Sequence, residues 1–178
     1  MPRSKDKVRK RLQQAALELY RKRGYDQTTA AEIAAKAGVT ERTFFRHFPD
    51  KREVLFDGEA VLKPALGQAV AASPTKLGAW ETLFWAFRAV EPLFVANRPF
   101  SEPRQKVIAS SPALQERELA KVGSLSAALA AALRQRGIAD RVATLAAQTG
   151  MATLNHALTS WLDDDSGEMH HHLVQAFH

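Results

Sequence analysis

Four side chains that can donate hydrogen bonds or carry positive charge stand within six residues of one another. Thr43, Arg46 and His47 have the spacing i, i+3 and i+4, with Arg42 beside them, so a helix would present them on one face. Arginine can bond a guanine edge through two donors, and threonine can contact a thymine methyl group. Either side chain can equally bind a phosphate. This face therefore predicts contact with the major groove of double-stranded DNA.

Two short helices joined by a turn are expected to position that face. Apolar residues at 33, 34 and 37 give the first helix one apolar side, and Gly38 follows where a helix can end in the left-handed conformation. Thr40 is a good N-cap and Glu41 favours a first helical turn, so a second helix begins there and ends near Phe48, before Pro49. A turn of about three residues between two helices is typical of a helix-turn-helix unit.

The charge of the chain is concentrated in its first third. Residues 1–58 contain 14 Lys and Arg against 8 Asp and Glu, whereas the other 120 residues contain 11 of each. Segregated positive charge favours a polyanionic partner, although a basic helix can also be merely a solvated face. Six of these basic residues begin a helix whose opposite side is apolar: Arg3, Lys5, Lys7, Arg9, Lys10 and Arg11.

Three consecutive segments, AALELYRKRGYDQTT, AAEIAAKAGV and TERTFFRHFPDKREVLF, resemble the tetracycline-repressor (TetR) family of bacterial transcription regulators over about residues 5–57. The resemblance implies that Thr28 and Thr29 start the supporting helix and that Lys51 opens a fourth helix close to a phosphate. Phe45 stands where the family often has tyrosine, and Arg42 where it often has a small residue or glycine. These departures resemble a subgroup whose base preference need not follow that of better known members. The implied DNA-binding residues are Thr28, Thr29, Thr40, Glu41, Arg42, Thr43, Phe45, Arg46, His47 and Lys51.

The rest of the chain also predicts helices, so the expected fold class is all-α. Segments rich in Ala, Leu, Arg, Gln and Glu are separated by Gly, Pro or Ser, and strand signals are nearly absent. Residues 1–57 are expected to form the helix-turn-helix domain and residues 58–178 a larger helical domain. About nine helices are expected, at 4–23, 29–37, 41–48, 51–72 with a kink at Pro64, 75–97, 101–109, 112–136, 139–164 and 166–178.

Aromatic residues in the second domain suggest either an ordinary core or a pocket for an apolar ligand. The family resemblance implies a cavity for a small-molecule effector there. The Arg98, Pro99, Phe100 turn and the SSPALQERELAKV segment resemble a subgroup with acyl-CoA-like ligands. The candidate ligand-binding residues are Phe84, Trp85, Phe87, Phe94, Phe100, Met151, Asn155 and Trp161, with His156 an alternative polar contact to Asn155.

The last two helices are expected to form a homodimer surface. A stripe of small and apolar residues would let a partner helix approach closely. The family resemblance implies a four-helix bundle of two helices from each subunit. The stripe consists of Val142, Leu145, Ala146, Thr149, Ala152 and Thr153.

Several other classes of site are disfavoured. The chain has no cysteine, no apolar run of roughly 20 residues and no signal-peptide core, which favours a cytoplasmic protein without a membrane span. His170, His171 and His172 are successive, so a helix would point them about 100° apart, which does not suit one metal ion. Asp163, Asp164 and Asp165 fit an exposed helix end. No spacing suggests a catalytic site, a metal or a cofactor, so we do not expect an enzyme.

The expected function is that of a dimeric, sequence-specific DNA-binding regulator. The resemblance implies a repressor that leaves a palindromic operator when a small, largely apolar effector binds. Two alternatives fit parts of the same pattern. One is a nonspecific nucleic-acid-binding protein, which the basic N-terminal third would also permit. The other is a helical small-molecule-binding protein without DNA reading.

Overall fold

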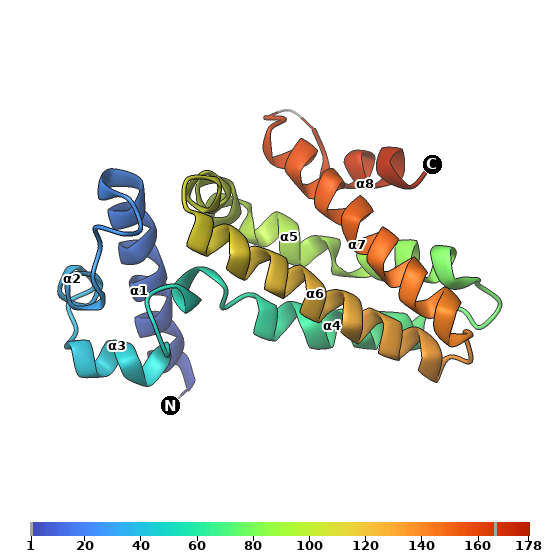
Figure 1. Cartoon of the computed structure of the whole chain (residues 1–178), viewed down its shortest axis with the longest axis horizontal. Helices are drawn as coiled ribbons and strands as arrows, with labels where there is room; N and C mark the ends of the chain where they lie inside the picture. Colours follow the sequence, from blue (N-terminus) through green and yellow to red (C-terminus); the bar gives the residue numbers. More distant parts are fainter. Residues whose placement is uncertain (1, 166) are drawn as a thin grey trace. The chain divides into compact units, whose positions relative to one another are not determined.

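A computed structural model describes residues 2–165 and 167–178, with side chains described from Lys5 onward; Met1, the side chain of Arg3 and the expected start of the last helix at residue 166 lie outside them. The described residues form helices and no strand, which confirms the all-α fold class (Figure 1). The elements are α1 (Pro2–Arg23), α2 (Ala30–Lys36), α3 (Glu41–His47), the 3₁₀ turn η1 (Glu53–Leu55), α4 (Glu59–Ala72), α5 (Ala79–Ala109), α6 (Pro112–Gln135), α7 (Asp140–Leu162) and α8 (Met169–Phe177). No helix among them is both long and apolar enough to cross a membrane.

The chain divides into two compact units. The first unit comprises Met1–Gly58 and Phe100–Glu118, and the second comprises Glu59–Pro99 and Leu119–His178. Helices α5 and α6 therefore each contribute residues to both units. Residues 100–118 carry as many acidic as basic side chains, so the first unit retains all of the excess positive charge.

The core of the first unit is built by α1, α2, α3 and η1 together with the ends of α5 and α6. Burial of apolar side chains is the main stabilising term for such short helices, since helices of this length are marginal on their own. The fully or nearly buried members include Leu12, Ile33, Phe44, Phe48, Val54, Phe56, Val107, Ile108 and Leu114.

Local contacts fix the start of α2 and the turn between α2 and α3. The hydroxyl of Thr29 accepts a hydrogen bond from the amide of Glu32 at 3.2 Å, and the Glu32 carboxylate accepts one from the amide of Thr29 at 2.9 Å, which completes a capping box. Gly38 has φ +66°, and Val39 N–H reaches back to the carbonyl of Ala34 at 3.0 Å, as in a Schellman motif. The predicted helix-turn-helix is confirmed.

The second unit is a cluster of five helices around one apolar core. Buried residues of α4, α5, α6, α7 and α8 all contribute to it, including Val70, Leu83, Phe87, Leu129 and Leu154. Small residues permit close helix packing. A side chain added at Gly150 of α7 would place its Cβ 2.8 Å from Cδ1 of Leu83 on α5.

Two expected helix boundaries were wrong. A break was expected between 97 and 101, but α5 continues from Ala79 to Ala109 with Pro92, Pro99 and Pro103 inside it. Each proline removes one helix hydrogen bond, but buried residues on both sides, such as Val90 and Val107, still hold the helix in place. The expected helix 51–72 is instead η1 followed by α4, and Pro64 lies inside α4.

Candidate nucleic-acid interface

Helix α3 has one buried side and one exposed side. Phe44 and Phe48 are buried at i and i+4, and their rings lie 5.8 Å apart between centroids. The exposed residues of the same helix include Glu41, Arg42 and Arg46. The buried aromatic pair therefore fixes the rotation of α3 about its axis, and that rotation leaves the two guanidinium groups facing solvent.

The first turn of α3 is held by threonines. The Thr40 hydroxyl caps the helix by accepting a hydrogen bond from the amide of Thr43 at 3.2 Å, and the two threonine hydroxyls lie 3.0 Å apart. Thr43 is half-buried, and its hydroxyl can still turn toward an outside acceptor because a hydroxyl both donates and accepts.

Phe45 is an apolar side chain on the exposed side. It is 51% exposed and packs edge to face on Phe44, with 5.3 Å between ring centroids. This contact orients the ring without covering it. A phenyl group in this place can contact a thymine methyl or a sugar, but it has no hydroxyl to donate to a phosphate.

His47 closes the exposed face at the C-terminal end of α3. Its imidazole is half-buried and lies 6.5 Å from the ring of Phe48. Desolvation lowers the pKa of His47 below 6.5, and the positive charges of Arg46, Arg9 and Lys5 lower it further. The imidazole is therefore mainly neutral at pH 7 in the free chain, and it can donate or accept a hydrogen bond according to its tautomer.

Lys51 lies in the turn before η1 and does not open a helix as expected. Its ammonium donates to the carbonyls of Tyr25 and Thr28, each at 2.8 Å, and lies 4.3 Å from the centre of the Tyr25 ring. Tyr20 donates from its hydroxyl to the Lys51 carbonyl at 2.6 Å, and burial raises the pKa of that phenol. Lys51 thus ties the loop before α2 to the segment after α3. An ammonium has three donors, so one remains for a phosphate.

The two threonines before α2 have different surroundings. Thr28 is fully buried, and its hydroxyl donates to the carbonyl of Gly24 at 2.8 Å, so its side chain supports the fold from inside. Thr29 is exposed but its hydroxyl is part of the capping box with Glu32. A direct DNA contact from the Thr28 side chain would require that residue to leave the core.

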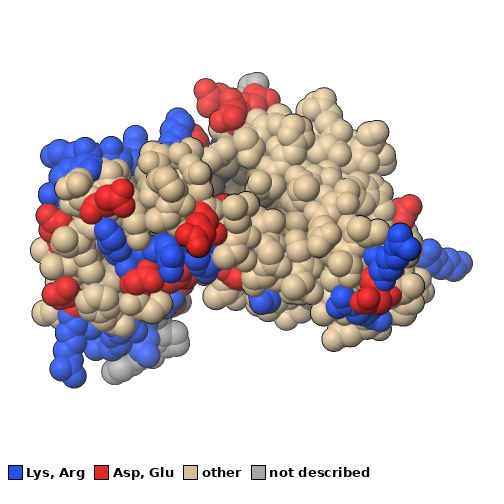
Figure 2. Space-filling view, viewed as in Figure 1, with Lys and Arg blue, Asp and Glu red and all other residues tan. Residues whose placement is uncertain are grey.

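Only part of the basic charge of α1 faces solvent. Arg9 forms a bidentate ion pair with Asp57 and lies over the Phe48 ring, and these hydrogen bonds to Asp57 raise its pKa. Arg11 donates to the carbonyls of Ala37 and Gly38, at the end of α2. Among the described residues 5–11, the exposed cations are Lys5, Lys7, Lys10 and Arg11, and the last of these is bonded to the end of α2. In Figure 2, Lys and Arg gather over the part formed by α1 to α3, whereas the visible face of the second unit carries few of them.

The candidate ligand-binding residues do not share one environment. Phe84 and Phe87 pack around Phe177 of α8, with ring centroids 5.2 and 5.8 Å away. Met151 and Trp161 are buried in the same core, Phe94 lies at its edge, and the guanidinium of Arg98 lies 4.7 Å from the Trp161 ring. Trp85 and Asn155 are exposed, and Phe100 packs in the core of the first unit. Arg98, Pro99 and Phe100 lie inside α5, not in the expected turn.

The successive histidines on α8 contact different neighbouring residues. His170 lies 3.5 Å from a carboxylate oxygen of Glu91, and His172 lies 3.1 Å from one of Asp164. In the part of the chain that the structure describes, no cluster of three or more His, Cys, Asp or Glu could hold a metal ion.

Sequence reasoning missed the residues that support α2 and α3 from a distance. Arg11 and Lys51 bond backbone carbonyls 23 to 27 residues away, and Arg9 pairs with Asp57, 48 residues away. Such contacts leave no periodic pattern, because neither residue type nor spacing specifies a partner at that separation. Of the residues that contact Lys51, Tyr20 lies near the end of α1 and Tyr25 lies in the loop between α1 and α2.

Comparison with known sequences agrees with this geometry. A profile of the family "Bacterial regulatory proteins, tetR family" matches residues 12–57. The HTH-type transcriptional regulator TcmR of Streptomyces glaucescens is 37% identical over 84 residues, which are 47% of this chain and 37% of that protein. The uncharacterized HTH-type transcriptional regulator YvkB of Bacillus subtilis (strain 168) is 51% identical over 43 residues, 24% of this chain and 23% of that protein. The chain thus spans well under half the length of the curated relatives it matches.

Solved structures extend the likeness in fold to almost the whole chain. SmeT of Stenotrophomonas maltophilia, in complex with triclosan, superposes with a TM-score of 0.66 at 18% identity, over 96% of this chain and 88% of that one. FadR of Thermus thermophilus, a TetR family repressor in complex with lauroyl-CoA, superposes with a TM-score of 0.56 at 25% identity, over 94% and 90%. Residues 12–57 thus match the tetR family of bacterial regulatory proteins, and the fold of almost the whole chain is similar to those of SmeT and FadR.

Proposed function

We propose that the chain is a sequence-specific, DNA-binding transcriptional regulator that acts as a repressor in the cytoplasm and has no catalytic step of its own. The observation that carries this proposal is the exposed face of α3. Arg42 and Arg46 face solvent there, while Phe44 and Phe48 fix the helix from behind. The match of residues 12–57 to the tetR family supports the same assignment.

DNA contacts would divide between base reading and phosphate binding. Arg42, Thr43, Phe45 and Arg46 are exposed or half-buried on α3 and would face base edges in the major groove. Thr40 and His47 lie at the two ends of that helix, and with Thr29 before α2 and Lys51 after α3 they would bind flanking phosphates. Glu41 is a carboxylate, so it would accept a hydrogen bond from a base such as cytosine. The exposed lysines of α1 would add a nonspecific, salt-dependent attraction.

A homodimer would present two copies of α3 to the DNA and would thereby set the length of the DNA site. On α7, Val142 is 50% exposed and Leu145 is 54% exposed, which is a large apolar exposure for a helix that buries its other side. Burial of this face against a second copy would set two α3 helices about 34 to 36 Å apart, one DNA turn, and would require a palindromic site.

The effector would be a small, largely apolar molecule bound in the second unit. The core of the second unit carries clustered aromatic rings, including Trp80 and Phe84, whose ring centroids lie 4.5 and 5.2 Å from that of Phe177. The lauroyl-CoA bound by FadR, at 25% identity, supports an acyl-bearing ligand. Effector binding would favour a state that releases DNA, and a complete switch from 1:99 to 99:1 requires about a 10⁴-fold preference between the two states.

Selection from a random duplex library tests the DNA-binding proposal. The purified chain should enrich a palindrome whose half-sites are about one helical turn apart. The matched control is the Arg42→Ala, Arg46→Ala double variant, which should not enrich it. If the DNA library stays random after repeated rounds of selection with the wild-type chain, the proposal is contradicted.

Tryptophan fluorescence tests the effector separately. All three tryptophans of the chain, Trp80, Trp85 and Trp161, lie in the second unit, so they report on binding there. Lauroyl-CoA should change their emission in a saturable way and release the selected duplex, whereas coenzyme A without an acyl chain should do neither. Emission unchanged by lauroyl-CoA would contradict an acyl-bearing effector but not DNA binding.

A further inference from the structure

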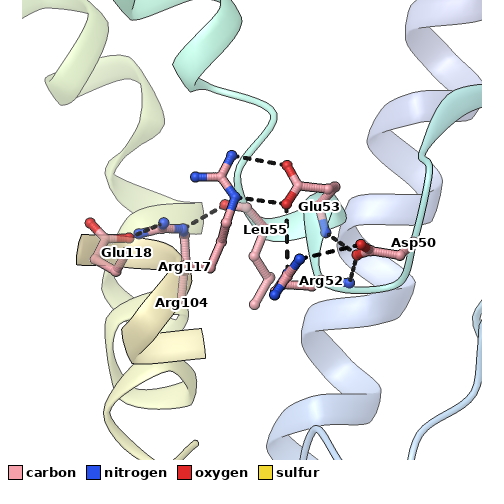
Figure 3. A network of polar contacts seen from close by, with 7 residues as sticks. All are labelled: Asp50, Arg52, Glu53, Leu55, Arg104, Arg117 and Glu118. Carbon is pink, nitrogen blue, oxygen red and sulfur yellow. Dashed lines mark hydrogen bonds and ion pairs between the residues drawn. The ribbon is translucent and has the colours of Figure 1, made fainter. Parts of the chain in front are cut away.

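A cluster of charged side chains surrounds η1, the 3₁₀ turn that follows the recognition helix (Figure 3). Arg117 of α6 donates to both carboxylate oxygens of Glu53, from Nε at 2.7 Å and from Nη2 at 3.0 Å. Arg104 of α5 donates from Nε to the carbonyl of Leu55 at 2.6 Å and from Nη2 to Glu118 at 2.5 Å. All of these residues belong to the first unit.

These contacts hold a turn that is too short to be stable by itself. A 3₁₀ segment of three residues satisfies few of its own backbone groups. The Asp50 carboxylate accepts hydrogen bonds from the amides of Arg52 and Glu53 at 2.8 and 3.0 Å, at the start of η1. Arg104 satisfies the Leu55 carbonyl at the other end. Side chains therefore fix η1 at both ends.

The same two arginines also hold the residue that ends the turn. Phe56 is buried, and the guanidinium carbons of Arg104 and Arg117 lie 4.8 and 4.7 Å from its ring centre. Cation–π contacts of this kind are stronger when the cation is shielded from water. The side chains of Arg117 and Glu53 are only 19% and 24% exposed, so their ion pair is better protected than a surface pair.

The turn is coupled to α3 by a short, packed connection. Five residues separate His47, the end of α3, from Glu53, the start of η1, and Phe48 in that stretch is buried. Val54, Leu55 and Phe56 are buried in the same core as Phe44. A shift of η1 would therefore displace the C-terminal end of α3, because a close-packed core transmits displacement.

We infer that Arg104 and Arg117 are positioning residues for DNA reading: they fix η1 and, through it, the end of the recognition helix. Both lie on helices that continue into the second unit. The inference rests on the proposed function of α3. It assigns to residues outside the helix-turn-helix a part in setting how specifically DNA is read.

The test compares variants of the full chain on two duplexes: the one that the wild-type chain enriches from a random library, and a scrambled duplex of equal length. Arg117→Gln should lower the ratio of the two affinities by roughly 5-fold to 30-fold. Affinity for the scrambled duplex should stay unchanged, because phosphate contacts tolerate a shifted helix. Arg104→Lys, a milder change, should lower the ratio in the same direction, since an ammonium cannot reproduce the fork that bridges Leu55 and Glu118.

Rescue and a control separate positioning from general destabilisation. The double variant Glu53→Arg, Arg117→Glu restores an ion pair and should recover most of the lost ratio. Arg134→Gln removes an ion pair with Asp140 in the second unit, 2.5 Å long and more exposed, and should leave the ratio unchanged. In Arg117→Gln, amide hydrogen exchange should rise within residues 41–56 and not along α1.

Two results would overturn the inference while leaving the proposed function intact. One is a wild-type specificity ratio that Arg117→Gln and Arg104→Lys both preserve. The other is an equal loss on both duplexes with faster exchange throughout the first unit, which would show ordinary destabilisation. A wild-type ratio near one would instead remove the proposed function, and with it this role.

Discussion

On α3, the guanidinium group of Arg46 faces solvent from a helix whose other side is buried. We predict that Arg46→Ala weakens binding to the selected duplex by roughly 1 to 3 kcal/mol if the side chain reads a base, with little change on scrambled DNA. A similar loss on both duplexes would identify a phosphate contact. Fluorescence anisotropy with labelled duplexes measures both affinities, and Arg88→Ala, an exposed arginine on α5, serves as the control.

Operator binding unchanged after both Arg46→Ala and Thr43→Ala would contradict the assignment of α3 as the recognition helix. These residues stand at i and i+3 on the same helix, so a bound duplex could not avoid both of them. The same titrations therefore show whether α3 is not the helix that reads DNA, or whether it is and Arg46 binds a phosphate and not a base.

His47 provides a pH-dependent prediction. Desolvation and the nearby cations lower its pKa in the free chain, and phosphates of a bound duplex would raise it again. Binding would then take up a proton, so affinity should increase as the pH falls from about 8 to about 6. His47→Gln should flatten that dependence, whereas His171→Gln on α8 should not. An identical pH slope in wild type and His47→Gln would contradict the prediction.

The stability of the free chain should change in the opposite sense. Because the folded-state pKa of His47 lies below its unfolded value of 6.5, the unfolded chain binds the proton more readily. The contribution of His47 to stability is thus present above pH 6.5 and decreases as the pH falls below it. Urea unfolding of wild type and His47→Gln at a series of pH values measures this difference.

Among the elements, the turn between α2 and α3 depends on a left-handed glycine. Gly38 has φ +66°, and an added Cβ would lie 2.8 Å from Nη2 of Arg11. Arg11 could move away only by giving up its hydrogen bonds to the Ala37 and Gly38 carbonyls. Gly24 has φ +84° with open space around it, so Gly24→Ala is a matched control.

Both alanine substitutions should cost about 1 to 2 kcal/mol for the left-handed backbone, and Gly38→Ala should cost more because it also disturbs Arg11. Chemical unfolding of each variant gives the two free energies of unfolding. Equal losses would show that the Arg11 contact contributes nothing to the stability of the turn.

The elements also show what the sequence can and cannot predict. Thr29, Thr40 and Gly38 are local signals, since each acts on backbone groups within five residues, and the predicted α2 and α3 have the expected places. The break expected at residues 98–100 and the helix expected to start at residue 51 were wrong because tertiary packing outweighed the local propensities. The packing of residues 100–118 with the first unit has no local signal at all.

For the whole molecule, function is expected to require a dimer. We predict that Leu145→Glu on α7 shifts the chain toward monomer at micromolar concentration and weakens binding to the palindromic duplex far more than to one half-site. Leu93→Glu on α5 changes an exposed leucine of another helix and should leave the dimer intact. Sedimentation velocity measures the assembly state, and a Leu145→Glu variant that remains dimeric would place the interface elsewhere.

Specific DNA reading by the whole chain is best tested by its affinity for DNA from beside its own gene, compared with scrambled DNA of equal length, across a salt series. We predict a ratio of about 10³ or more, with both affinities falling as salt increases. A ratio of specific to scrambled affinity near one, on this DNA and on library-selected duplexes, with a steep dependence on salt, would contradict the claim that the chain is a sequence-specific regulator. It would leave a protein that binds nucleic acid through its N-terminal positive charge alone.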